Sequence, residues 1–195
     1  MIELKVVNDK EGKQFVKDTI QNFHSYVPST SSVGRRIDWI IFNESKPVGM
    51  IGIGSSVYPA PKDILKFTGK SLSEYKECFN TFANNWRFCM REKIKNAGTQ
   101  ILKELRRQAP LQWKEKYGDN LKYLITFVAG GNNGAVYKAD NWSMIGETAG
   151  LPKHKSVSMK WDDKESLKTK YVKPTGENKK LIFFKKIEQN KNKIY

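Results

Sequence analysis

Short runs of hydrophobic residues, many of them β-branched or aromatic and alternating with polar ones, predict that much of this chain forms β-strands. Polar, Gly or Pro segments bound most of these runs, as they do in strand-and-turn proteins. Strands are predicted at residues 2–7, 36–42, 48–57, 84–90, 121–128, 156–161 and 181–186, with a further strand after residue 141.

The second and third strands form a predicted β-hairpin around a turn at residues 43–47. The third strand contains Gly49, Gly52 and Gly54. Glycines inside a strand indicate a bulge or a place where another group approaches the backbone. We therefore expect this hairpin to lie in the middle of the sheet.

Helical periodicity fills the gaps between the strands. Asn8 with Glu11 resembles a capping box, so a first helix is predicted to begin there. Pro59 and Pro61 are expected to break the pattern after the third strand, and Ser71 with Glu74 then predicts a second, short helix. The longest helix is predicted from Asn96 to just before Pro110, and a short one at residues 134–139.

These elements alternate without an internal repeat, which predicts an α/β or α+β fold in a single domain. The domain is expected to span residues 1–188, and residues 189–195 are expected to form a basic tail.

The charge balance points to a partner. The 35 Lys and Arg residues oppose 20 Asp and Glu residues, which gives a net charge of +15. Such a field attracts polyanions and exceeds what solubility requires. DNA is therefore the expected partner, and a Lys-rich soluble surface is the alternative.

Cysteine and histidine usage limits the chemistry. Cys78 and Cys89 lack a Cys-x-x-Cys spacing, so no zinc knuckle or disulfide framework is predicted. With only two His residues, a His-rich zinc site is excluded and no metal ligands are assigned, although iron stays open as a cofactor. No apolar run has membrane-spanning length and no signal peptide begins the chain, so we expect a cytoplasmic protein without a membrane partner.

Four side chains could carry chemistry. His24 and Tyr26 follow the first predicted helix, where a His is a packing residue or, alternatively, a metal ligand, a general base or a recognition residue. Arg87 interrupts an apolar strand, and its guanidinium needs an internal ion pair or a bound anion. Tyr137 lies on the short helix, where an aromatic is commonly a core residue.

The start of the longest predicted helix is a candidate anion site, because helix N-termini attract phosphates. Arg91 and Lys93 precede Asn96, Ala97 and Gly98 there, and these five are the candidate cofactor-binding residues.

The order of the elements resembles that of the Gcn5-related N-acetyltransferases (GNAT), a mixed and splayed sheet with helices on both faces. Its resemblance to an acetyltransferase tyrosine that protonates the leaving thiolate makes Tyr137 a candidate proton donor. Several segments together also resemble the phage Mom family of DNA-modification proteins and its relatives in Druantia-type defence and transposase-linked proteins. The matching segments are residues 23–26 (FHSY), 34–41 (GRRIDWII), 47–54 (PVGMIGIG), 87–88 (RF), 96–102 (NAGTQIL), 127–130 (FVAG), 134–142 (GAVYKADNW) and 146–148 (GET).

This resemblance implies an enzyme that modifies the exocyclic amine of adenine in DNA and so protects the DNA from restriction. It implies His24, Tyr26, Arg87 and Tyr137 as catalytic residues, and acetyl-coenzyme A or another activated donor as cofactor. The expected DNA-binding residues are Arg35, Arg36, Lys138, Trp142, Lys153 and Lys155.

The chain departs from these families at two places. The acetyltransferase loop Gln/Arg-x-x-Gly-x-Gly/Ala is not present in that form near Asn96. Ala129 stands where Mom relatives have an aspartate, and Asp38 and Asp140 are the candidate replacements. Three hypotheses follow: a DNA-base acyltransferase, a non-catalytic DNA-binding or anti-restriction protein on the same fold, and a general N-acetyltransferase.

Overall fold

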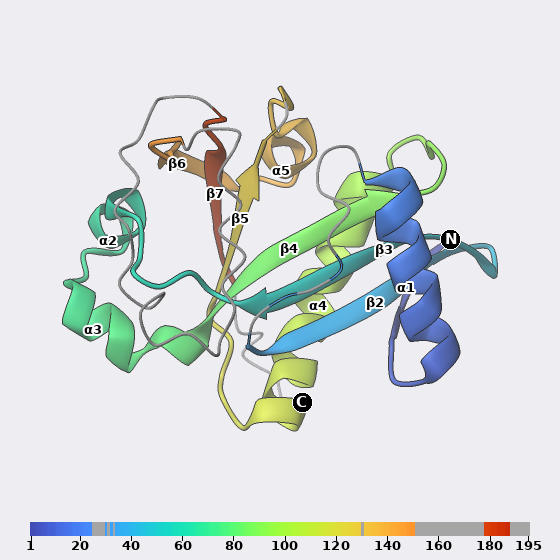
Figure 1. The fold of residues 1–195 in the computed structure, drawn as a ribbon, viewed down its shortest axis with the longest axis horizontal. Coiled ribbons are helices and arrows are strands. Elements are labelled where there is room, and N and C mark those ends of the chain that lie inside the picture. Colours follow the sequence, from blue (N-terminus) through green and yellow to red (C-terminus); the bar gives the residue numbers. More distant parts are fainter. Residues whose placement is uncertain (25–29, 31, 33, 130, 151–177, 188–195) are drawn as a thin grey trace, which may run out of the picture.

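A computed structural model describes residues 1–24, 30, 32, 34–129, 131–150 and 178–187 of the chain. They form one seven-stranded sheet in the order β1-β2-β3-β4-β5-β7-β6 (Figure 1). The strands are β1 (Ile2–Val6), β2 (Arg36–Asn43), β3 (Lys46–Ser55), β4 (Phe82–Met90), β5 (Tyr123–Val128), β6 (Ser143–Glu147) and β7 (Leu181–Lys186). This mixed α+β architecture confirms the predicted fold class.

The sheet opens where β4 meets β5. All other neighbouring strands are antiparallel, whereas β4 and β5 are parallel and pair only from Phe82 to Asn84. Beyond that point the two strands diverge, and β5, β7 and β6 turn away from β1–β4 (Figure 1). Two parts of the sheet therefore enclose a wedge at the carboxyl ends of β4 and β5.

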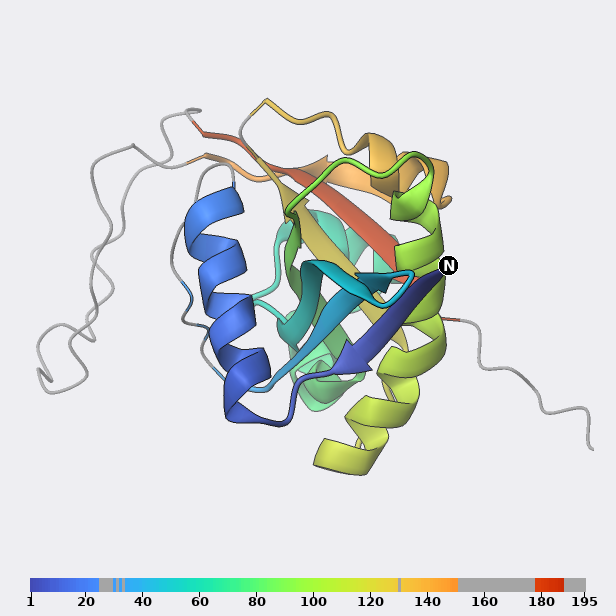
Figure 2. The ribbon, with the colours of Figure 1, turned by 90° about the vertical axis from the view of Figure 1, so that its right-hand side faces the viewer.

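Helices cover both faces of the sheet. The two long helices, α1 (Lys10–Phe23) and α4 (Ala97–Tyr117), lie on opposite faces (Figure 2). Two short helices, α2 (Lys62–Thr68) and α3 (Leu72–Glu77), adjoin the β5–β7 side, and the 3₁₀ turn η1 (Phe79–Thr81) leads into β4. The fifth helix, α5 (Ala135–Ala139), follows β5 beside the wedge.

The largest core lies between the sheet and α4. Its fully buried members include Trp39 and Ile51 from the sheet and Leu105 and Trp113 from α4. A second core joins α2 and α3 to β5 and β7, and a small third one places Val16 and Ile20 of α1 against β3 and β4. The face under α1 is thus much less apolar than the face under α4.

Helix starts were mostly predictable from capping residues. Ser71 and Glu74 form the expected capping box at α3. The cap of α1 is Asp9 and not Asn8, since Asp9 accepts a 2.6 Å hydrogen bond from the Gly12 amide. Asp9 and Gly12 have the Ncap-to-N3 spacing, which a carboxylate satisfies as well as a hydroxyl does.

Two predictions about prolines were wrong. Helix α4 does not end before Pro110 but continues to Tyr117, because Trp113 on the same face is buried and its indole N–H donates to the Asn80 carbonyl at 2.9 Å. Burial of this face outweighs the backbone hydrogen bond that Pro110 removes. Helix α2 was missed because Pro61, treated as a breaker, is its N-cap.

The predicted strand at residues 156–161 and the tail at residues 189–195 lie outside the described residues. Among the described helices, none is long and apolar enough to cross a membrane.

Candidate active site

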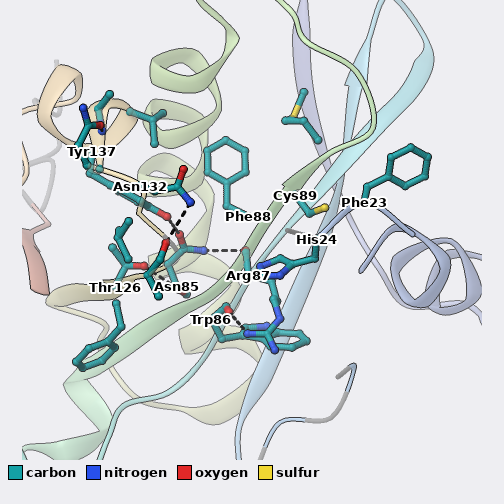
Figure 3. A pocket seen from close by; sticks show the side chains of 18 residues that line it. Phe23, His24, Asn85, Trp86, Arg87, Phe88, Cys89, Thr126, Asn132 and Tyr137 are labelled. Carbon is teal, nitrogen blue, oxygen red and sulfur yellow. Dashed lines mark hydrogen bonds between the residues drawn. The ribbon is translucent and has the colours of Figure 1, made fainter. Parts of the chain in front are cut away.

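A cavity of about 370 Å³ fills the wedge between β4 and β5 (Figure 3). Its walls are β4 from Asn85 to Met90, β5 from Thr126 onward, the loop leading to α5, and the carboxyl end of α1. The structure brings His24, Arg87 and Tyr137 to this one cavity. Tyr26 lies outside the described residues. Of the described residues that line the cavity, none is Asp or Glu.

An irregularity in β4 shapes the floor of the cavity. Gly52 of β3 pairs with Arg87, but the next residue, Ile53, pairs with Asn85, so Trp86 is the extra residue of a bulge. The Asn85 side chain fixes this bulge by donating to the carbonyls of Gly52 at 2.8 Å and Arg87 at 3.0 Å. The bulge bends β4 locally where the strand lines the wedge.

Tyr137 projects from α5 into the cavity and is buried. Its hydroxyl donates a 2.7 Å hydrogen bond to Oδ1 of Asn85 (Figure 3). Phe183 stacks on its ring and Trp142 packs edge-on against it. Gly134, the residue before α5, has φ +69° and no space for a Cβ beside Phe183, which explains the glycine at this turn. The phenol is therefore held in one position beside the β4 bulge.

His24 and Arg87 lie together on the side of the cavity opposite Tyr137 (Figure 3). His24 is the C-cap of α1, and its amide donates to the Ile20 carbonyl at 3.2 Å. Burial, and then the charge of Arg87, lower the pKa of His24 below its ordinary value. The imidazole is thus mainly neutral at pH 7 and can accept a proton.

Arg87 has a fixed direction. Its Nη1 donates to the Trp86 carbonyl at 2.7 Å, and its guanidinium lies 4.8 Å from the Trp86 ring centre. Burial, and then the charge of Arg87, also lower the pKa of Lys180, which precedes β7. The charge of Arg87 therefore affects the protonation of both His24 and Lys180.

Trp86 lies on the α1 face, anchored by Asp38 of β2. Its indole N–H donates to Asp38 Oδ1 at 3.1 Å, and Arg36 covers its ring at 4.1 Å while donating to Asp38 Oδ2 at 2.6 Å. A Cβ on Gly52 would lie 2.5 Å from the Trp86 indole nitrogen and closer still to Asp38. The glycine noted in the sequence thus marks the close approach of Trp86 and Asp38 to the backbone of β3.

The amino end of α4 is the second predicted ligand site. Asn96 adopts a left-handed conformation with φ 59°, and no side chain caps the first turn. Lys93-x-x-Asn96-x-Gly98 has the spacing of Gln/Arg-x-x-Gly-x-Gly/Ala and matches it in identity at Gly98, and Asn96 adopts the backbone conformation that favours glycine. Sequence reasoning missed this correspondence because it compared residue identities and not backbone conformations.

The individual residues of this end differ in what they can offer. Lys93 is exposed at a hollow of about 680 Å³ beside Phe88 and Val136, which also line the main cavity. The Ala97 side chain is buried, and Gly98 leaves the space that Val136 of α5 occupies. Only the backbone of these two residues can therefore face a ligand.

Arg91 does not belong to this end. Its guanidinium donates to Oγ1 of Thr19 at 2.8 Å and to the Phe15 carbonyl at 3.2 Å, and it lies 3.7 Å from the Phe15 ring centre. These contacts hold it against α1, so its predicted cofactor role is not supported.

Three of the predicted DNA-binding residues have internal roles instead. Arg35 pairs with Asp119 and covers the Tyr117 ring, and Arg36 is held by Asp38 and Trp86. Trp142 is buried, so it cannot stack on a base. Lys138 is exposed on α5, and Lys153 and Lys155 lie outside the described residues.

No described acid replaces the missing aspartate of the Mom pattern in the cavity. Ala129 lines the cavity, whereas Asp38 is held by Arg36 and Trp86, and Asp140 by Arg106 and the Trp142 indole. Burial raises the pKa of the Cys89 thiol, which also lines the cavity, to about 11, so it stays protonated at neutral pH. Within the described residues, no group of three His, Cys, Asp or Glu could hold a metal ion.

Comparison with solved structures places this architecture among known folds. An acetyltransferase of the GNAT family from Streptococcus pneumoniae aligns with 96% of this chain and 100% of its own, with a TM-score of 0.54 and 13% identity. The ribosomal-protein-S18-alanine N-acetyltransferase from Escherichia coli aligns over 100% and 99%, with a TM-score of 0.51 and 9% identity. The fold is that of the GNAT acetyltransferases.

An N-acetyltransferase from Staphylococcus aureus Mu50 gives the same GNAT fold, with a TM-score of 0.53, 10% identity, and coverage of 96% and 98%. No protein-family model and no curated protein matches the chain significantly. The fold is shared at a level of sequence divergence where residue identities carry little information, so the site has to be argued from its own geometry.

Proposed function

We propose that this protein transfers an acyl group from a thioester donor to an amine, with the reaction taking place in the wedge between β4 and β5. The observation that carries the proposal is the Tyr137 hydroxyl, held at 2.7 Å from Asn85 inside the opening of the sheet. In the acetyltransferases that this chain resembles, a tyrosine on this helix protonates the leaving thiolate, and we assign that role to Tyr137.

The residues present fit a coenzyme A thioester as donor. The uncapped first turn of α4, with the left-handed Asn96 and the exposed Lys93, offers backbone N–H groups and positive charge to a pyrophosphate. When bound, such a donor supplies an activated acyl group with a thiolate as leaving group.

His24 and Tyr137 then divide the proton transfers. Neutral His24 accepts the proton that the attacking amine loses as the new C–N bond forms. Tyr137 donates its hydroxyl proton to the sulfur as the C–S bond breaks, and Arg87 orients the acceptor. The two proton-transfer groups lie on opposite sides of the cavity, which suits an acceptor and a donor that enter from different sides (Figure 3).

The test is donor binding and turnover. Calorimetry should detect saturable binding of acetyl-coenzyme A, and thiol release should follow addition of an amine acceptor. Tyr137→Phe should lower the rate about 100-fold or more while donor binding is retained. Tyr123→Phe is the matched control, because Tyr123 lies on β5 away from the cavity lining. Absence of binding of any short-chain acyl-coenzyme A would overturn the proposal.

We further propose DNA as the acceptor, with transfer of a small acyl-like or glycine-derived group to the exocyclic amine of a base, adenine first. The net charge of +15 favours it, as does a cavity in which the described lining includes Arg87 and His24 but no carboxylate. Mass spectrometry of nucleosides from DNA co-expressed with the protein should reveal a new nucleoside. Acetylation of small amines or peptides without any nucleoside change would favour a general N-acetyltransferase.

A further inference from the structure

A groove of about 890 Å³ lies away from the candidate active site and shares no lining residue with it. It lies between α4 and the strands β6 and β7, with Phe67 of α2 at its edge. Of the four described residues that were predicted from the sequence to bind DNA, none lines it. The groove is therefore a separate feature of the fold.

The charge of the groove is strongly one-sided. Among the lining residues that the structure describes, five are cationic and one, Glu104, is a carboxylate. Hydrogen bonds from Arg107 hold the pKa of Glu104 below its usual range, so this carboxylate is ionised but committed to its neighbour. The cations are Lys103, Arg106, Arg107, Lys185 and Lys186.

These cations differ in whether other residues of the protein already engage them. Arg106 pairs with Asp140, and Lys185 donates to the carbonyls of Asp140 and Asn141. Lys103 and Lys186 are exposed, and no ion pair among the described residues involves either of them. The paired cations stiffen the walls, and the two exposed lysines present charge to a ligand.

An aromatic surface accompanies this charge. Phe67 is 51% exposed, and its ring centre lies 5.0 Å from that of buried Phe184, which also lines the groove. A large exposed aromatic supported from below offers one open face for stacking. A cationic groove with an aromatic platform is the combination that binds single-stranded nucleic acids without sequence preference.

We propose that this groove binds single-stranded nucleic acid, with phosphates against Lys103 and Lys186 and an unstacked base on Phe67. An acidic protein segment would be attracted by the same charge, but its carboxylates would not stack on the exposed Phe67 ring. The exposed ring therefore favours the nucleic acid. This proposal stands apart from acyl transfer, because it concerns binding at a different surface.

Binding of labelled oligo-dT, oligo-U and a DNA duplex at several salt concentrations tests it. The pair Lys103→Ala/Lys186→Ala should weaken oligo-dT binding about tenfold and flatten the slope of log affinity against log salt by about 1.4. The matched control is Lys76→Ala/Lys114→Ala, which removes the same charge from exposed lysines outside the groove. Circular dichroism melting shows whether each variant is folded.

Phe67→Leu separates stacking from charge. It should weaken oligo-dT binding about tenfold with an unchanged salt slope and should leave duplex binding unaffected. Similar binding of oligo-U and oligo-dT would support the proposal and would indicate that the groove accepts the backbone of RNA as well as that of DNA. Equal losses in both lysine pairs, no effect of Phe67→Leu, or tighter binding of a poly-glutamate peptide than of oligo-dT would each overturn the proposal.

Discussion

Trp39 and Trp86 lie on opposite faces of the same sheet, and each indole N–H reaches a side-chain oxygen on a neighbouring element. Trp39 donates to Gln108 of α4 at 3.0 Å and is completely buried among aliphatic residues. Trp86 donates to Asp38 at 3.1 Å and is only partly buried, between the guanidiniums of Arg36 and Arg87. The same residue type thus stabilises one face and furnishes a polar surface on the other.

This contrast shows where the stability and the chemistry of the molecule lie. The α4 face buries an extensive apolar core, whose burial supplies most of the folding free energy. The α1 face replaces aliphatic packing with an Asp38–Arg36 ion pair and with glycines that leave space for Trp86. Because buried ion pairs contribute little net stability, we infer that this face is maintained for ligand binding.

The largest expected effect is the loss of stability on replacing Trp39, which tests the difference between the two faces. Trp39→Ala should lower the free energy of unfolding by about 3–5 kcal/mol, because it leaves a large cavity in the main core. Trp86→Ala should cost about 1–2 kcal/mol, since its side chain is only partly buried, and should reduce acceptor turnover more than donor binding. Urea unfolding followed by circular dichroism measures both. Equal destabilisation would contradict the distinction between the faces.

A second change tests the space under Trp86. Gly52→Ala should cost about 2 kcal/mol, because the added Cβ would overlap the Trp86 indole and Asp38. Gly54→Ala is the matched control on the same strand: its Cβ would lie 3.0 Å from the Arg35 carbonyl and 3.8 Å from Trp86, so a smaller loss is expected. Thermal melting compares the two. If both variants melt like the wild type, the close packing of this face is wrong.

His24 provides a pH-dependent test of the polar face. Its pKa is lowered in the folded protein, so the acyl-transfer rate should be constant near pH 7 and fall about tenfold per pH unit below the folded pKa. His24→Gln should be slower and lose this dependence. If the wild-type rate does not fall in acid, His24 is not the base.

The stability of the fold should also depend on the protonation of His24, and the direction of this dependence follows from its lowered pKa. The folded state binds the His24 proton less readily than the unfolded chain does, so stability is fully present above pH 6.5 and decreases as the pH falls toward the folded pKa. Charged Arg87 is the neighbour that adds to the effect of burial. Arg87→Met should therefore raise the pKa of His24, which titration by NMR measures directly.

The sequence predicted most of the fold because its hydrophobic periodicity and capping residues are local signals. The strand at residues 181–186 and the capping box at Ser71 appear as expected. Helix α4 extends past Pro110 because Trp113 finds its partners in the distant η1 and β2 segments, which no local pattern records. Tertiary burial of this kind overrides a local breaker.

The site was only partly predictable for a related reason. The resemblance to known families singled out His24, Tyr26, Arg87 and Tyr137, and the structure places the three of them that it describes at one cavity. Arg35 and Arg36 looked equally available for DNA in the sequence. In the structure Arg35 pairs with Asp119, far along the chain, and Arg36 pairs with Asp38 on the same strand. Whether a cation faces solvent or an internal acid depends on these pairings, so net charge alone does not tell which cations are open to a partner.

The smallest expected effect concerns the helix that covers the polar face. Asp9→Ala removes the cap of α1 and should lower the unfolding free energy by about 1 kcal/mol, whereas Asp9→Ser should retain most of it. Because only a small apolar cluster holds α1 to the sheet, hydrogen exchange should accelerate in α1 while α4 amides stay protected. Acceleration of both helices together would show that the two faces unfold as one unit, and the comparison would then describe packing without separate stability.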